Sequence, residues 1–219
     1  MREPSSALKD RTEAGTELAR QLTHLRAEGP VVLALPRGGV PVGFEIARWL
    51  PAPLDILIVR KIGSPGNPEY GLGAIVEGGH VELDVDRMRE GGYSLAELRP
   101  VIDRELREAE RRASVYRSVR PRVGWKKRTV IVVDDGAATG GTLFAAIRAV
   151  RAQGAGRVVV AVGVAPPDTC HRLNREADEL HVLREPANFH AVGEYYQRFD
   201  PVNDDEVLEL LRQAGTVPS

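Results

Sequence analysis

A segment with the chemistry of an anion-binding loop runs from Val130 to Thr142. Apolar residues lead to Asp134 and Asp135, and small residues then lead to a Thr-Gly-Gly-Thr run. Small residues let backbone N–H groups approach a phosphate, and a helix after them would add the positive end of its dipole. The adjacent carboxylates can accept hydrogen bonds from a diol or lie near a metal. We therefore predict a phosphate site beside two acidic residues, rather than carboxylates that only cap a helix.

This segment resembles the 5-phosphoribosyl-1-diphosphate (PRPP) signature of type I phosphoribosyltransferases. The resemblance implies that Asp134 and Asp135 hold the ribose 2′- and 3′-hydroxyls and contact a metal only indirectly, through PRPP. It also implies that the 5′-phosphate is bound by Ala137, Ala138, Thr139, Gly140, Gly141 and Thr142. Gly136 departs from the signature, because the family more often has an apolar residue there. Neither a Gly-x-Gly-x-x-Gly dinucleotide motif nor a Walker Gly-Lys-[Ser/Thr] fits this segment.

A second candidate for anion binding is the turn Pro36–Gly39, which follows an apolar run. Parallel strands present their carboxyl ends at one sheet edge, so this turn is expected on the same edge as Asp134. By resemblance it is the diphosphate-binding turn, in which Arg37, Gly38 and Gly39 meet the leaving group. Taken alone, the same residues would indicate an ordinary tight turn.

Lys61 is expected to supply a further cation, with Arg60 as the alternative. In the family that this chain resembles, a flexible loop in this region closes over the site and brings cations to the diphosphate. A solvated strand end is the competing interpretation of both residues. The predicted catalytic set is Arg37, Lys61, Asp134 and Asp135.

The acceptor site is expected in the segment Arg184–Gly193, after the last predicted strand. Phe189 could stack on a small planar acceptor and His190 could hydrogen-bond to it, although both residue types are also common in packing and at surfaces. The aromatic cluster Tyr195–Phe199 belongs either to the core or to an interface. Ala138 stands where hypoxanthine–guanine members of the family have an aspartate, which counts against a 6-oxopurine acceptor.

The elements that must position these residues alternate along the chain. Short apolar runs predict buried strands, and apolar residues at helical spacing predict the helices between them. The predicted strands are Val31–Leu35, Leu54–Val59, Thr129–Val133, Arg157–Val164 and Glu179–Leu183. The predicted helices are Ala7–Arg26, Pro41–Leu50, Thr142–Gln153, Cys170–Glu176 and Glu206–Ala214.

The alternation breaks in the middle of the chain. Gly63–Gly79 is too rich in glycine for a regular element, although Gly73–Val76 could be a short strand. A helix follows from Leu95, with Ser94 as its cap, and Pro100 should kink that helix or mark its true start. Its polar face, which includes Glu105, is expected to be solvated.

We therefore predict an α/β fold: an open, mainly parallel sheet of the type I phosphoribosyltransferase kind, with an inserted small α+β subdomain. Residues 1–63 and 126–219 would form the phosphoribosyltransferase core. Residues 64–125 would form the inserted subdomain, with the flexible loop and the long helix. As a whole, the chain resembles a group of bacterial phosphoribosyltransferases of unassigned substrate.

The resemblance implies a Mg²⁺-dependent transferase of nucleotide metabolism. It would displace diphosphate from C1 of PRPP with a nitrogen nucleophile, for which a nucleobase is the favoured source, and give a nucleoside 5′-monophosphate. The alternative is a regulatory protein that binds PRPP without turnover, and a hydrolase that uses water as acceptor is a further alternative. Family members are often dimers, which favours a homodimer.

Composition narrows the setting. The chain has 219 residues, a formal net charge of -1 and 28% charged residues, which is typical of a globular protein and gives no basic excess for nucleic acid. Cys170 is the single cysteine, so neither an intrachain disulfide nor a cysteine metal cluster can form. Met1–Arg20 is too polar for a signal peptide, and the apolar runs are too short for a membrane span. These features predict a cytoplasmic protein without nucleic-acid or membrane partners.

Overall fold

A five-stranded parallel sheet forms the centre of the computed structural model, which describes residues 7–215. Its strand order is β2-β1-β6-β7-β8. The strands are β1 (Val31–Ala34), β2 (Leu54–Ile56), β6 (Thr129–Gly136), β7 (Arg157–Val164) and β8 (Glu179–Arg184). Their apolar runs match the burial that a sheet covered on both faces imposes. The predicted α/β class with a mainly parallel sheet is confirmed.

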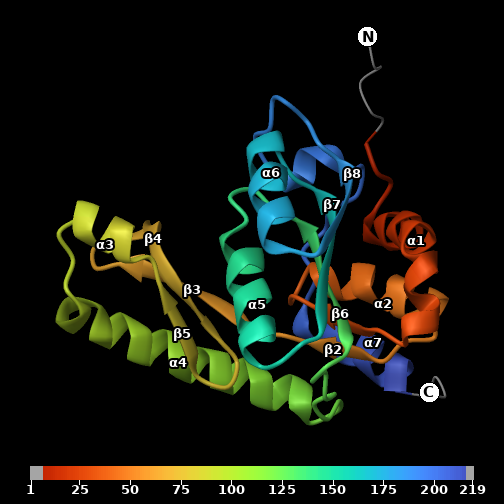
Figure 1. Ribbon diagram of the computed structural model, residues 1–219, viewed down its shortest axis with the longest axis horizontal. Helices are drawn as coiled ribbons and strands as arrows, with labels where there is room; N and C mark the ends of the chain where they lie inside the picture. Colours follow the sequence, from red (N-terminus) through yellow and green to blue (C-terminus); the bar gives the residue numbers. More distant parts are fainter. Residues whose placement is uncertain (1–6, 216–219) are drawn as a thin grey trace.

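Helices cover both faces of this sheet (Figure 1). One face is covered by α1 (Arg11–Gln21), the short 3-10 helix η1 (Thr23–Glu28), α2 (Gly39–Trp49) and α7 (Asp204–Gly215). The other face is covered by α5 (Gly141–Ala152) and α6 (Pro167–Glu176). Alternate strand residues enter opposite cores: Val32 packs toward α1 and α2, whereas Val31 packs toward α5.

A second, antiparallel sheet stands beside α5, with strand order β3-β4-β5 (Figure 1). Its elements are β3 (Val59–Ser64), β4 (Asn67–Val76), β5 (His80–Leu83), α3 (Val85–Glu90) and α4 (Leu95–Arg117). One face packs Ile62, Leu72 and Ile75 against α4, and Ala74 and Val76 join the core around α5. The small sheet therefore lies between α4 and α5, and the cores on its two faces fix its place.

The glycine-rich region is more regular than we expected. Gly63–Gly79 forms most of the β3-β4 hairpin, so the prediction of an irregular stretch is wrong. Gly66 has a φ of 83° in the turn, and a Cβ at Gly73 would lie 2.2 Å from the backbone oxygen of Glu82. Glycine here permits a turn and a close strand approach, so it does not break the sheet.

The element boundaries near residue 60 also differ from the prediction. The strand predicted over Leu54–Val59 ends at Ile56, and Val59 already begins the first strand of the small sheet. A division of the chain between residues 63 and 64 therefore crosses β3. The division into a core and an inserted subdomain remains a prediction, because the positions of these strands do not show where one folding unit ends and the other begins.

The long helix α4 begins where its cap predicts. Ser94 and Glu97 form both hydrogen bonds of a capping box, and the helix continues through Pro100. The lost N–H of Pro100 is offset by the packing of this part of α4 against the small sheet. Glu105 corrects the expectation of a solvated face, since it is only 9% exposed and pairs with Arg60 at 2.6 Å. Across residues 7–215, each helix is too short or too polar to cross a membrane.

Candidate active site

The two candidate motifs leave adjacent strands at the same edge of the sheet. β1 and β6 are parallel neighbours, with Ala34 opposite Val133, and the N–H of Leu35 donates to the Val133 carbonyl at 2.9 Å. The 36–39 turn therefore starts beside Asp134, as the parallel arrangement predicts. The peptide bond between Pro36 and Arg37 in this turn is cis.

The glycines of the turn pack directly against the acidic pair. A Cβ added to Gly38 would lie 2.0 Å from Oδ2 of Asp135, and one added to Gly39 would lie 2.5 Å from the Val133 carbonyl oxygen. A side chain at Gly38 would displace the Asp135 carboxylate, and a side chain at Gly39 would displace the backbone of β6. The structure thus brings the 36–39 turn and Asp135 into contact, although they lie far apart in the sequence.

Asp135 is held by a residue that sequence analysis missed. Nε of Arg11, on α1, donates to Oδ2 of Asp135 at 2.7 Å, and these two side chains are 12% and 13% exposed. The guanidinium lies 3.9 Å from the ring centre of Phe199, and its Nη1 donates to the Asp200 carbonyl at 2.8 Å. A lone arginine in a helix carries no motif. The signal in the sequence was indirect, because a shielded carboxylate at a strand end needs a cationic partner.

Asp134 has a different environment from its neighbour. Burial raises the pKa of Asp134 well above its usual value, and the negative charge of Asp135 raises it further. Its Oδ1 accepts the backbone N–H of Asp135 at 2.9 Å, which partly offsets these effects. The pair therefore combines a carboxyl group that holds its proton more strongly than usual with one that faces a guanidinium.

The 137–142 loop offers open backbone N–H groups at the start of α5. Gly140 adopts a φ of 74° at the N-cap, and no side chain caps the helix. Ala138, Thr139, Gly141 and Thr142 are exposed, so the positive end of α5 is open to a ligand. Ala137 differs, because it is buried and its N–H donates to the Val164 carbonyl at 2.8 Å. Its N–H is thus already used within the fold.

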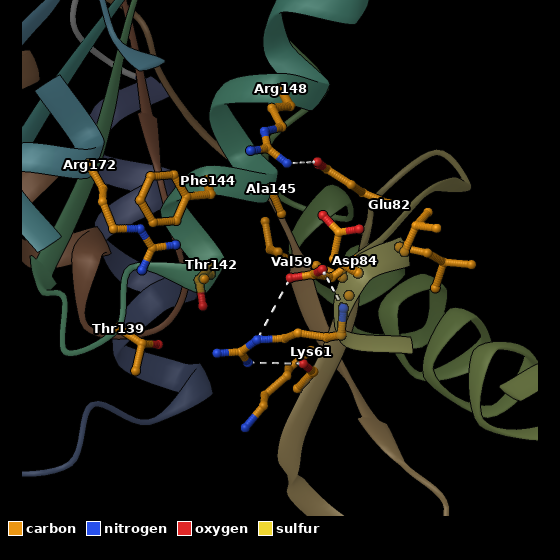
Figure 2. Close-up of a pocket in the computed structure, with 18 residues that line it drawn as sticks. Val59, Lys61, Glu82, Asp84, Thr139, Thr142, Phe144, Ala145, Arg148 and Arg172 are labelled. Atoms are coloured by element: carbon orange, nitrogen blue, oxygen red, sulfur yellow. Dashed lines mark hydrogen bonds and ion pairs between the residues drawn. The ribbon is translucent and has the colours of Figure 1, made fainter. Parts of the chain in front are cut away.

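A cavity of about 520 Å³ extends from this loop to the small sheet. Figure 2 shows Thr139 and Thr142 on the α5 side, and Lys61 and Asp84 on the side of the small sheet. Further charged lining residues are Glu82, Asp86, Arg87, Arg148 and Arg172. Lys61 is thereby placed across the cavity from the 137–142 loop, whereas its neighbour Arg60 pairs with Glu105 on α4.

Arg37 lies at the surface, 44% exposed, with Nη1 4.0 Å from Oδ1 of Asp204 at the start of α7. The same carboxylate accepts the hydroxyl of the buried Tyr116 from α4. Burial and the negative charge of Asp204 raise the pKa of Tyr116, so its hydroxyl stays a donor. An exposed pair at 4.0 Å is weak, so Arg37 can turn toward an anion at little cost.

The segment after β8, residues 185–199, packs over the strand ends, and we call it the hood segment. A Cβ at Gly136 would lie 2.3 Å from Cγ1 of Val192, so the hood segment fills the space that an apolar residue at position 136 would need. Tyr196 is buried and donates its hydroxyl to the Asp135 carbonyl at 2.6 Å, which assigns this part of the aromatic cluster to the core. Gly163 makes room for that hydroxyl.

The two acceptor candidates lie in this hood segment. The Phe189 ring is stacked on Tyr195, with 5.9 Å between the ring centres and 11° between the planes. His190 is exposed. Both lie outside the set of residues that line the 520 Å³ cavity, which extends from the 137–142 loop toward the small sheet. Lys61 therefore lines the cavity, whereas Phe189 and His190 lie in the hood segment outside its lining.

This fold and this strand-end site define a class of protein. Residues 5–197 match the family model of the phosphoribosyl transferase domain, and the chain belongs to that family. Two curated proteins of Mycobacterium tuberculosis, from strains CDC 1551 and H37Rv, carry the name "Putative phosphoribosyl transferase" and are 45% identical to it over 205 residues. The match covers 94% of this chain and 46% of each relative, so the chain spans about half their length.

A solved structure shares the fold of this chain. The protein TT1426 from Thermus thermophilus is 45% identical to this chain and superposes with a TM-score of 0.84. The superposition covers 94% of this chain and 98% of TT1426. The likeness therefore includes both sheets, and not only the parallel core.

Proposed function

We propose that this protein transfers the phosphoribosyl group of PRPP to a nitrogen nucleophile and releases diphosphate. The observation that supports the proposal most strongly is the contact between the 36–39 turn and Asp135. This contact joins a turn suited to a diphosphate to an acidic pair suited to a diol. The 137–142 loop that follows the acidic pair then leads to a helix N-terminus suited to a phosphate. PRPP carries these three groups on one ribose.

The residues would divide the work by the part of PRPP that they meet. Asp134 and Asp135 would accept hydrogen bonds from the ribose hydroxyls, and the hydrogen bond from Arg11 holds the Asp135 carboxylate in place. Exposed N–H groups of the 137–142 loop would bind the 5′-phosphate. Arg37 and Lys61 would oppose the charge that builds on the departing diphosphate. Catalysis would then consist mainly of positioning and electrostatic stabilisation.

Mg²⁺ is the metal that this family implies, and the residues present fit a metal held mainly by the substrate. Asp135 is already bound by Arg11, and the raised pKa of Asp134 disfavours direct coordination. Mg²⁺ commonly keeps substrate phosphates and water as ligands, with few from protein. When bound, it would supply charge neutralisation on the diphosphate, and Asp134 and Asp135 would meet it through PRPP.

The acceptor would lie under the hood segment. Phe189 offers an aromatic face and His190 a hydrogen-bonding group, and the same segment reaches the end of β6 where Val192 contacts Gly136. Ala138, exposed in the 137–142 loop, offers no side-chain acceptor or base. We therefore favour a planar nitrogen heterocycle other than a 6-oxopurine.

A calorimetric titration with Mg²⁺-PRPP tests the proposal, followed by assays of diphosphate release with a panel of free bases. We expect PRPP binding in the wild type and release with one class of base. Asp135→Ala should abolish binding within the range of the titration. The matched control is Asp103→Asn, because Asp103 is a surface carboxylate of α4 paired with Arg99.

The outcomes separate the competing functions. Binding followed by base-dependent release supports the transferase. Binding without release for any base replaces it with a regulatory protein that senses PRPP, and release without a base indicates hydrolysis. If the wild type fails to bind PRPP, or Asp135→Ala binds as well as wild type, the assignment of the site is wrong.

A further inference from the structure

A cluster of two histidines and one glutamate lies at the opposite end of the parallel sheet from the candidate active site. His24 comes from η1, and Glu179 and His181 lie two residues apart at the start of the edge strand β8. Nε2 of His24 is 2.9 Å from Oε1 of Glu179, and Nε2 of His181 is 2.6 Å from the same oxygen. The three ligand atoms lie within 4.8 Å of one another. We propose that they form a binding site for a divalent transition metal, with Zn²⁺ as its best-fitting ion.

The hydrogen bonds behind the rings determine which nitrogen faces the cluster. Nδ1 of His24 lies 3.0 Å from the backbone oxygen of Gln21, and Nδ1 of His181 lies 3.1 Å from its side-chain oxygen. A carbonyl oxygen can only accept, so each Nδ1 carries a hydrogen. In a neutral imidazole the other nitrogen, Nε2, then carries a lone pair.

Three electron-pair donors therefore converge on one point: two Nε2 atoms and a carboxylate oxygen. Nε2 of His181 and Nε2 of His24 lie 2.6 and 2.9 Å from Oε1 of Glu179, so each contact needs either a ring proton or a metal ion to join the two atoms. A single metal ion would take all three atoms as ligands once they move apart by a few tenths of an ångström, since Zn²⁺ binds nitrogen and oxygen ligands at about 2.0–2.2 Å.

The donor set selects the metal. Two imidazole nitrogens and one carboxylate oxygen suit Zn²⁺, whereas Mg²⁺ prefers oxygen ligands alone. His24 is half exposed, at 50%, which leaves a path for the ion and for water as a fourth ligand. The more buried His181 and Glu179, at 16% and 22%, would form the fixed part of the site.

The surroundings resemble the outer shell that metal sites use. Gln21 orients both rings, as the partners of metal-ligating histidines do. Nη2 of Arg157 holds the other carboxylate oxygen of Glu179 at 2.5 Å, and Glu28 pairs with Nη1 of Arg157 at 2.7 Å. The positive charge of Arg157 near the metal is thus balanced by a second carboxylate.

A metal here would tie two elements together. η1 follows α1, and β8 runs along the sheet edge beside α1 (Figure 1). Binding to the folded chain and not to the unfolded chain raises stability by mass action. We therefore expect Zn²⁺ to raise the melting temperature without any need for PRPP.

The test is a calorimetric titration of the metal-free full chain with Zn²⁺, together with a melting curve. Loss of an outer partner alone typically weakens metal binding by about 10- to 100-fold, so loss of a direct ligand should cost at least about tenfold. His24→Ala, His181→Ala and the isosteric Glu179→Gln should each show this loss. His171→Ala is the matched control, because His171 is exposed on α6 and outside the cluster. Co²⁺ should give the absorption bands of a four-coordinate site in the wild type.

Two results would overturn the proposal. One is the absence of Zn²⁺ binding to the wild type, or Zn²⁺ binding by all three variants as tight as that of the wild type. The other is a melting temperature that responds to pH through His24 and His181 but not to Zn²⁺, which would identify a protonated cluster. Cys170 should not compete for the ion, since burial raises the pKa of its thiol to about 11. The readouts do not involve PRPP, so they stand apart from the proposed function.

Discussion

The two aspartates at the end of β6 occupy contrasting electrostatic environments although they are neighbours. Asp135 receives a guanidinium hydrogen bond at 2.7 Å, whereas Asp134 receives a backbone N–H and faces the charge of Asp135. The sequence motif predicts that both residues belong to the site. It cannot predict the difference between their surroundings, because Arg11 reaches Asp135 from a separate helix.

Arg11 is predicted to act as a positioning residue for PRPP binding. Arg11→Ala should weaken PRPP affinity by about 10- to 100-fold, since a hydrogen bond to a charged group is worth about 1.5–3 kcal/mol and each 1.4 kcal/mol is tenfold. Arg11→Lys should recover part of the loss, because it restores the charge but not the stacked guanidinium on Phe199. Calorimetry measures both, with the exposed Arg20→Ala of the same helix as control. Equal affinities of wild type and Arg11→Ala would refute this role.

Asp134 should make stability fall as the pH rises. Its pKa is raised above the ordinary 3.8, so the folded chain keeps this proton to a higher pH than the unfolded chain does. Between 3.8 and the raised value the folded state binds more protons, and the free energy of unfolding therefore decreases with pH.

Asp134→Asn tests this dependence, because the amide oxygen keeps the hydrogen bond from Asp135 but cannot ionise. Relative to wild type, the variant should gain stability progressively as the pH rises above the ordinary pKa of 3.8, and it should lose PRPP affinity. Urea denaturation over a series of pH values, with Asp103→Asn as control, measures the difference. A constant or shrinking difference as the pH rises would contradict the assignment.

At the scale of elements, the parallel sheet was the most predictable part. Apolar runs such as Arg157–Val164 coincide with whole strands, since burial on both faces leaves no alternative to apolar residues. The β3-β4 hairpin was missed because its glycines are typical of loops, while their cause, the close approach of β5 at Gly73, lies outside the segment. Likewise, the 137–142 loop is a local motif, whereas Arg11 and Val192 join the site through long-range contacts.

The contact between Gly136 and Val192 explains why this chain departs from the family signature. The hood segment occupies the space where a side chain at position 136 would lie. Gly136→Ala should destabilise the fold by about 1–3 kcal/mol, the usual cost of overpacking. Adding Val192→Ala should restore most of that loss.

A double-mutant cycle in urea measures this coupling. Gly124→Ala is the control, because a Cβ at Gly124 would meet nothing within 4 Å. The double variant should be more stable than the sum of the two single changes predicts. Gly136→Ala should also weaken PRPP binding, and the double variant should regain that affinity together with its stability. Additive losses would show that the hood segment and the strand end are independent.

At the scale of the whole molecule, a buried ion-pair network joins the two sheets. Arg117, at the end of α4, pairs with Asp55 of β2 and with Glu77 after β4, the latter at 2.9 Å. Asp55 is fully buried, and its other oxygen accepts the Val123 N–H at 2.8 Å. This network holds α4 and one end of the small antiparallel sheet against the parallel sheet, and Lys61 in β3 lines the cavity from that small sheet.

Arg117→Met should therefore destabilise both sheets together rather than the small antiparallel sheet alone. It leaves the carboxylate of Asp55 buried without its cation, which typically costs about 3–5 kcal/mol. Arg111→Met is the matched control on the same helix, because Arg111 is 60% exposed and its pair with Glu108 should contribute less than about 1 kcal/mol. Adding Asp55→Asn to Arg117→Met removes the stranded charge and should recover part of the loss.

Urea denaturation followed by tryptophan fluorescence measures all four proteins, since Trp49 lies on α2 and Trp125 shortly before β6. A single cooperative transition that shifts as a whole is expected. Separate transitions for the two sheets would show that the network does not couple them.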